Sequence, residues 1–178
     1  MNRNELARKI FETSHLEGSF RLRSGQISNE YFDKYLFESN PELLIVIAKH
    51  LVKIIPEGTE VLAGLEMGGI PIATTLSIQT GIPVVFVRKK AKEYGTCKLA
   101  EGTDIRNKQL CIIEDVVTTG GQIILSANDL KQLGARIRYV LCVIERDRKS
   151  KDNLSKEGLE LVSLFTMEEL KSSVTTQQ

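Results

Sequence analysis

Short, continuous apolar runs alternate with segments of helical periodicity through most of this chain. The runs occupy residues 61–64, 84–87, 110–113 and 139–144, and a weaker run at residues 159–164 has the character of an edge strand. Strands that are apolar on both faces and separated by helices are typical of a parallel sheet covered on both sides. The sequence therefore predicts an α/β fold with a central parallel sheet flanked by helices.

The segments between these runs predict the remaining elements. Helical spacing of apolar residues predicts an N-terminal helix, a helix that begins at Pro41, helices over residues 69–79 and 121–133, and a short last helix over 167–171. Weak alternation over residues 20–34 indicates a small hairpin-like element. Residues 91–108 are polar, charged and glycine-containing, so we expect a long loop there, and loops of that length are uncommon unless functional.

The chemistry of the chain gathers where the predicted strands end, which is where parallel sheets bind ligands. The most informative stretch, residues 110–122, joins a buried strand to the acid pair Glu114 and Asp115 and then to a small-residue turn that opens a helix. Backbone N–H groups at such a turn suit a phosphate. Two carboxylates beside them suit sugar hydroxyls or a metal. The stretch predicts a phosphorylated sugar as the ligand.

Three further strand ends carry glycines, bases or acids. Residues 64–69 form a glycine-bearing turn that could cradle a second phosphate, although many strand-to-helix turns are rich in glycine. The basic run 88–92 leads into the long loop and could close over a pyrophosphate, or it is an ordinary solvated charge run. Arg146 follows the run at 139–144 and could pair with a planar carboxylate, or it belongs to a charged loop.

Composition excludes several classes of protein. The 178 residues fit a single domain, and 24 Lys and Arg balance 23 Asp and Glu, which argues against a dedicated nucleic-acid binder. No apolar run is long enough to span a bilayer, and the N-terminus lacks a secretory signal, so we expect a cytoplasmic protein. The three cysteines form no Cys-x-x-Cys pair or cluster with histidine, which favours reduced thiols over a zinc site or disulfides.

Four motifs resemble one enzyme family. The run CIIEDVVTTGGQ at residues 111–122 resembles the signature with which type I phosphoribosyltransferases bind phosphoribosyl pyrophosphate (PRPP). The runs VRKKAKEYGT at 87–96, AGLEMGGIPIA at 63–73 and SGQISNEYFD at 24–33 resemble orotate phosphoribosyltransferases in particular. The likeness extends from about residue 20 to about residue 148.

The resemblance implies a reaction and an architecture. PRPP and orotate would give orotidine 5′-phosphate and pyrophosphate, a step of de novo pyrimidine (UMP) synthesis, with Mg²⁺ held mainly by the pyrophosphate and no direct protein ligand. The chain would be one domain, residues 1–178, with a core at about 41–165 and a small hood from about 1–40 plus the C-terminal part. It would work as a homodimer with shared active sites, without nucleic acid or membrane.

The resemblance also implies roles for particular residues. Lys92, Asp115 and Glu114 would be catalytic, the two acids holding the ribose hydroxyls, and residues 65–69 would approach the pyrophosphate. Orotate would contact Thr118, Arg146 and Arg23. The residues that would bind PRPP are Arg88, Lys89, Lys92, Tyr94, Glu114, Asp115, Val116, Val117, Thr118, Thr119, Gly120, Gly121 and Gln122.

Some residues depart from the family pattern. Tyr94 stands where many relatives have His, and a phenol can still donate a hydrogen bond. Arg23 replaces a frequent Lys, and Asn29 and Glu30 replace a common Pro and aromatic residue. Two alternatives stay open: a phosphoribosyltransferase for another base, and a non-catalytic regulator that senses PRPP and binds RNA or DNA. The balanced charge speaks against the regulator.

Overall fold

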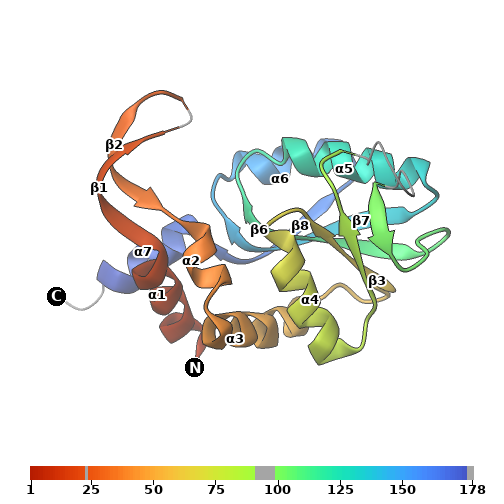
Figure 1. Cartoon of the computed structure of the whole chain (residues 1–178), viewed down its shortest axis with the longest axis horizontal. Coiled ribbons are helices and arrows are strands. Elements are labelled where there is room, and N and C mark those ends of the chain that lie inside the picture. Colours follow the sequence, from red (N-terminus) through yellow and green to blue (C-terminus); the bar gives the residue numbers. More distant parts are fainter. Residues whose placement is uncertain (23, 91–98, 176–178) are drawn as a thin grey trace.

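A central six-stranded sheet with helices on both faces forms most of the molecule (Figure 1). The computed structural model describes residues 1–22, 24–90 and 99–175. The helices are α1 (Arg3–Ser14), α2 (Lys34–Glu38), α3 (Pro41–Leu51), α4 (Gly69–Thr80), α5 (Gly121–Gln132), α6 (Lys149–Lys156) and α7 (Met167–Thr175), with a 3-10 turn at Val52–Ile54. The strands are β1 (His15–Arg21), β2 (Ile27–Phe32), β3 (Val61–Leu65), β4 (Val84–Val87), β5 (Ala100–Gly102), β6 (Gln109–Val117), β7 (Arg136–Glu145) and β8 (Glu160–Thr166).

The strand order of the large sheet is β5-β4-β3-β6-β7-β8. All neighbouring pairs are parallel except β4 and β5, so the predicted α/β fold with a parallel sheet is confirmed, and β8 lies at an edge as expected. The long loop expected at residues 91–108 is interrupted by β5, which the sequence analysis missed. Its three residues, Ala-Glu-Gly, carry no apolar pattern, and they pair with β4 through the backbone. Gly102 permits this close approach, since a Cβ there would lie 2.9 Å from the Val84 carbonyl oxygen.

Both faces of the sheet are buried under helices, and the side chains of β6 alternate between the two apolar clusters that result. Cys111 and Ile113 join the cluster formed with α1, α3, α4 and α7. Leu110 and Ile112 join the cluster formed with α5 and α6. This period of two explains why the strand sequence is continuously apolar. Cys111 and Cys142 are buried free thiols, and burial raises the pKa of Cys111 to about 12.

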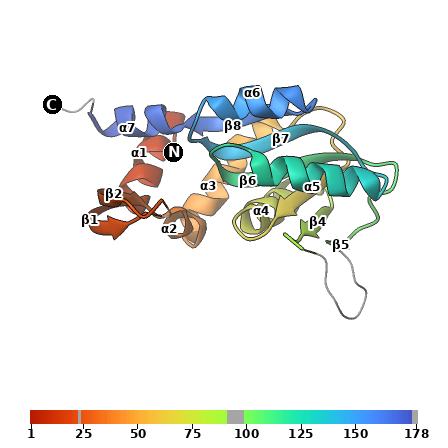
Figure 2. The same cartoon turned by 90° about the horizontal axis from the view of Figure 1, so that it is seen from above.

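A separate hairpin, β1 and β2, stands away from the large sheet and confirms the element expected near residues 20–34 (Figure 1). Figure 2 shows this hairpin gathered with α1 and α7 at one end of the molecule. The chain then returns to the sheet through α2, whose first turn is capped by the Asp33 carboxylate, and through α3, capped by Asn40 with Pro41 in its first turn.

Two helices were not predicted, α2 and α6. The α6 sequence carries no helical periodicity, since Leu154 is its only large apolar residue. That leucine is fully buried, which anchors the helix. None of the described helices is both long enough and apolar enough to cross a membrane.

Candidate active site

The turn between β6 and α5 presents backbone groups at the carboxyl edge of the sheet. Thr118, Thr119, Gly121 and Gln122 are exposed there, and the N-cap residue of α5, Gly120, has no side chain with which to cap the first turn. Gly120 has a φ of 81° and packs against Leu154, where a Cβ would lie 3.0 Å from the Leu154 Cγ. A glycine is required for this turn, and the turn leaves the N-terminal N–H groups of α5 available to an anion.

The acid pair at the end of β6 occupies two environments. Glu114 is half-buried, whereas Asp115 is completely buried. Asp115 Oδ1 accepts a hydrogen bond from the Val116 N–H at 2.5 Å, and Asp115 Oδ2 accepts one from Lys34 Nζ at 2.5 Å. Lys34, supplied by α2, therefore provides the positive charge beside these adjacent carboxylates.

Glu38, four residues after Lys34, completes a cluster of three carboxyls and one ammonium. Burial and the neighbouring Asp115 raise the pKa of Glu38 to about 9. Burial and the charge of Asp115 likewise raise the pKa of Glu114 to about 8. Burial acts to raise the pKa of Asp115 as well, but hydrogen bonds from Glu38 and Lys34 outweigh it, so that pKa is lowered. The directions of these shifts favour Asp115, paired with the Lys34 ammonium, as the anion of the cluster, and Glu38 as a neutral acid.

The turn between β3 and α4 lies directly against this cluster. A Cβ on Gly68 would lie 1.6 Å from Asp115 Oδ2, and a Cβ on Gly69 would lie 2.2 Å from the Ile113 carbonyl oxygen. Both glycines are therefore needed for packing, whatever they contribute to phosphate binding. Glu66 begins this turn, its peptide bond to Met67 is cis, and its Oε1 accepts the Lys89 N–H at 2.6 Å.

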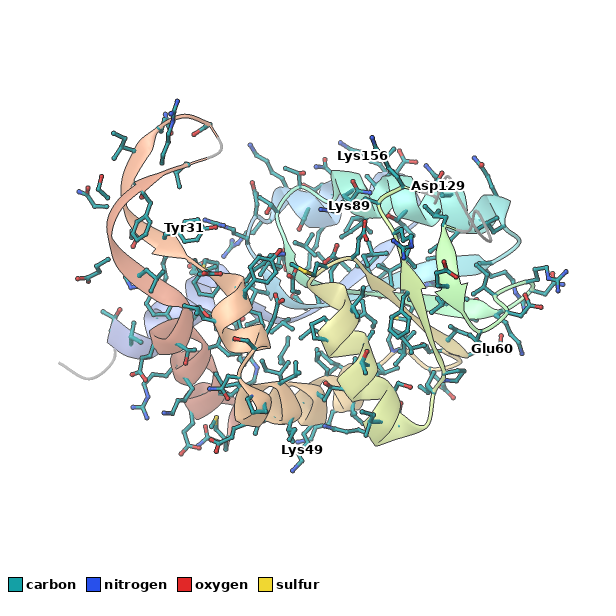
Figure 3. All side chains as sticks on the ribbon, in the orientation of Figure 1. Tyr31, Lys49, Glu60, Lys89, Asp129 and Lys156 are labelled. Carbon is teal, nitrogen blue, oxygen red and sulfur yellow. The ribbon has the colours of Figure 1, made fainter. Side chains whose placement is uncertain are left out.

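The basic residues after β4 are described only in part. Arg88 is half-buried, its Nε lies 4.0 Å from Glu101 Oε1, and Lys89 is exposed. Figure 3 shows Lys89 beyond the end of β4 and Tyr31 on the β1–β2 hairpin. Lys92, Tyr94 and Arg23, which the sequence analysis assigned to PRPP and orotate, lie outside the described residues.

Arg146 lies beside the turn between β6 and α5, although it follows a different strand, β7. Its backbone N–H donates to the Val117 carbonyl at 2.8 Å, and the residue is exposed. It lines a surface cavity of about 580 Å³ together with Met167, Glu168 and Lys171. The preceding Glu145 is buried and binds Lys151 Nζ at 2.9 Å, which indicates a structural role for that acid.

The structure thus brings Glu114, Asp115, the turn at 118–122 and Arg146 to one edge of the sheet. Lys34 and Glu38 were not predicted as residues of this site. The sequence does place Lys34 and Glu38 four residues apart, around the apolar Tyr35-Leu36-Phe37. This spacing puts the two side chains on one face only if the segment is a helix, and α2 was not predicted. Within the described part of the chain, no group of three or more His, Cys, Asp or Glu could hold a metal ion.

Comparison with known proteins agrees with this geometry. A phosphoribosyl transferase domain model matches residues 37–170. The orotate phosphoribosyltransferase of Nocardioides sp. is 49% identical over 93% of this chain and 92% of the relative. The chain belongs to the orotate phosphoribosyltransferase family.

Solved structures show the same fold. The orotate phosphoribosyltransferase of Mycobacterium tuberculosis, crystallised with Fe(III) dicitrate, superimposes with a TM-score of 0.85 at 26% identity, covering 94% of this chain and 98% of that one. The same enzyme in complex with PRPP superimposes with a TM-score of 0.81 at 23% identity, covering 95% and 98%. In the present chain, β6 and α5, which carry the acid pair and the turn after it, therefore belong to a fold shared with these structures.

Proposed function

We propose that this enzyme transfers the phosphoribosyl group of PRPP to orotate, giving orotidine 5′-phosphate and pyrophosphate in de novo UMP synthesis. The observation that carries the proposal is the joining of an acid pair and an uncapped, exposed phosphate turn on β6 and α5, in a chain 49% identical to a named orotate phosphoribosyltransferase.

The residues of the site match the charges that develop in this reaction. Breaking the bond between ribose C1 and pyrophosphate builds positive charge on the sugar and negative charge on the leaving group. Asp115 carries the negative charge of the acid cluster, and the more exposed Glu114 lies where ribose hydroxyls can reach it. The backbone N–H groups of residues 118–122, a turn in which every residue except Gly120 is exposed, would hold the 5′-phosphate. Residues 65–69, Arg88 and Lys89 would meet the pyrophosphate, with Lys92 and Tyr94 closing over it.

We propose Mg²⁺ as the cofactor, held mainly by the pyrophosphate. The acid cluster is compatible with this arrangement. Lys34 already neutralises Asp115, so the described carboxyls offer Mg²⁺ no preformed set of protein ligands. When bound, Mg²⁺ supplies charge neutralisation to the leaving group. Thr118 and Arg146, on the same edge as the acid pair, would hold orotate together with Arg23. The guanidinium of Arg146 is suited to the orotate carboxylate.

The same family membership supports three further proposals. The chain would form a cytoplasmic homodimer in which the loop bearing Lys92 and Tyr94 is shared between subunits. It would act as one domain, with a hood from about residues 1–40 plus the C-terminal part over a core at about 41–165. It would bind neither nucleic acid nor membrane, in keeping with the near-zero formal net charge of +1.

The test follows the ultraviolet absorbance of orotate with purified protein, PRPP and Mg²⁺, with adenine, hypoxanthine and uracil in parallel. We expect loss of orotate that requires every component and stops when EDTA removes the metal. Turnover of another base would overturn the assignment of Arg146 to orotate. Binding of PRPP without turnover of any base, together with retention of RNA or DNA at moderate salt, would favour the regulator.

A further inference from the structure

Helix α2 directs two side chains at one buried carboxylate. Lys34 and Glu38 are four residues apart and share a face of the helix, and both reach Asp115. Glu38 is 7% exposed, and no described protein group outside the carboxyl cluster donates a hydrogen bond to its Oε1. Burying a carboxyl costs free energy, so packing alone does not explain why a glutamate lies here, and a chemical role is indicated.

The Glu38 and Asp115 carboxyls both lie against Gly68. An added Cβ on Gly68 would lie 1.6 Å from Asp115 Oδ2 and 3.0 Å from Glu38 Oε1. Both oxygens therefore border the same small space, which only a glycine leaves open. Two ionised carboxylates confined in this way would repel each other, which favours a proton on one of them.

The surrounding charges decide which carboxyl holds that proton. The groups that face Glu38 are Lys34 on its own helix and Asp115 and Glu114 on β6. Lys34 Nζ and the Val116 N–H both donate to Asp115, which stabilises Asp115 as the anion. Within the described part of the chain no such donor reaches Glu38 Oε1, so Glu38 is left as the neutral acid, able to donate its proton to the Asp115 carboxylate.

We propose that Glu38 is a positioning residue for phosphoribosyl transfer: as a neutral acid it donates a hydrogen bond to Asp115 and holds that buried negative charge in place for the positive charge that develops on the ribose. The inference rests on the proposed function for its kinetic consequence. Its structural part, a proton on Glu38, stands on the geometry of α2, Gly68 and β6. The role needs no contact between Glu38 and substrate.

The test compares Glu38→Gln and Glu38→Ala with Glu57→Gln, a matched change at an exposed acid away from the cluster. We expect Glu38→Ala to lower kcat/KM for PRPP by about 10-fold or more, the effect of losing one hydrogen bond to a charged group. Glu38→Gln, whose amide can still donate, should stay within about threefold of the wild type near neutral pH. Above the Glu38 pKa of about 9, the ratio of Glu38→Gln to wild-type kcat/KM should rise with pH, because only the wild type loses its donor.

Equal kinetics for Glu38→Ala and the wild type at every pH would overturn the proposal, and so would a Glu38→Gln to wild-type ratio that is flat with pH. A second measurement is independent of turnover and of the stability of the alanine variant. In protein labelled with ¹³C at glutamate carboxyls, the signal missing from Glu38→Gln should titrate in the alkaline range. A signal that titrates in the ordinary acidic range would overturn the proposal while leaving orotate turnover intact. Wild-type protein without turnover would refute the proposed function instead.

Discussion

The buried Glu38 predicts an unusual dependence of stability on pH. Its pKa is raised from 4.5 to about 9 in the folded chain. Between those pH values the folded state keeps a proton that the unfolded state releases. The folded state therefore binds more protons, and the free energy of unfolding falls as pH rises through this window. Glu38→Gln cannot ionise in either state, so the variant should gain stability relative to the wild type as pH rises.

The size of this gain follows from linkage. One pKa unit corresponds to about 1.4 kcal/mol, so an independent group would contribute about 4 kcal/mol between about pH 5 and about pH 8. Glu114, whose pKa is also raised, shares the same environment and competes for protons. We therefore expect the difference in unfolding free energy between Glu38→Gln and the wild type to grow by about 2–4 kcal/mol over that range.

The assay is urea unfolding followed by far-ultraviolet circular dichroism at several pH values, because the chain has no Trp for fluorescence. Glu57→Gln is the control, and its difference from the wild type should be nearly constant with pH, since Glu57 is exposed. A Glu38→Gln difference that stays constant within about 0.5 kcal/mol, or that shrinks with rising pH, would refute the reasoning.

Three other changes test the rest of the site. Lys92→Ala should lower kcat by about 10²–10³, the scale of removing one preorganised donor to the leaving group, and near-normal turnover in a steady-state assay would exclude that role. Arg146→Ala should raise KM for orotate about 10-fold or more with little change in KM for PRPP, and an unchanged orotate KM would reassign the base site. Gly69→Ala should destabilise the fold, because its Cβ would lie 2.2 Å from the Ile113 carbonyl oxygen, and thermal unfolding at the wild-type temperature would contradict the close packing of α4 on β6.

Much of the architecture could be predicted from local pattern. The continuous apolar runs predicted β3, β4, β6, β7 and the edge strand β8, because strands buried on both faces must be apolar at every position. Pro41 and the spacing that follows it predicted α3. The motif at residues 111–122 indicated the acid pair and the turn, and its likeness to one family indicated the enzyme class that the comparisons confirm.

The elements that were missed lack a local signal. β5 is three residues long and forms only because Gly102 lets its backbone approach β4. α2 is a five-residue helix, stabilised by the Asp33 cap and by the burial of Phe37. α6 has a single large apolar anchor, Leu154, which lies under Gly120. Each depends on a contact with a segment distant in sequence, which periodicity cannot register.

The parallel sheet, the acid pair and the turn that follows β6 could be predicted from the chain, since they depend on the apolar period and on residues adjacent in sequence. The meeting of Lys34 and Glu38 with Asp115, 81 residues beyond Lys34, depends on how the chain folds. The physical reason is that a carboxyl's protonation depends on desolvation and on the charges around it, and these are properties of the packed site. Nothing in the sequence distinguishes Glu38 from a solvent-exposed glutamate, and it becomes a neutral acid because α2 packs it beside Gly68 and β6.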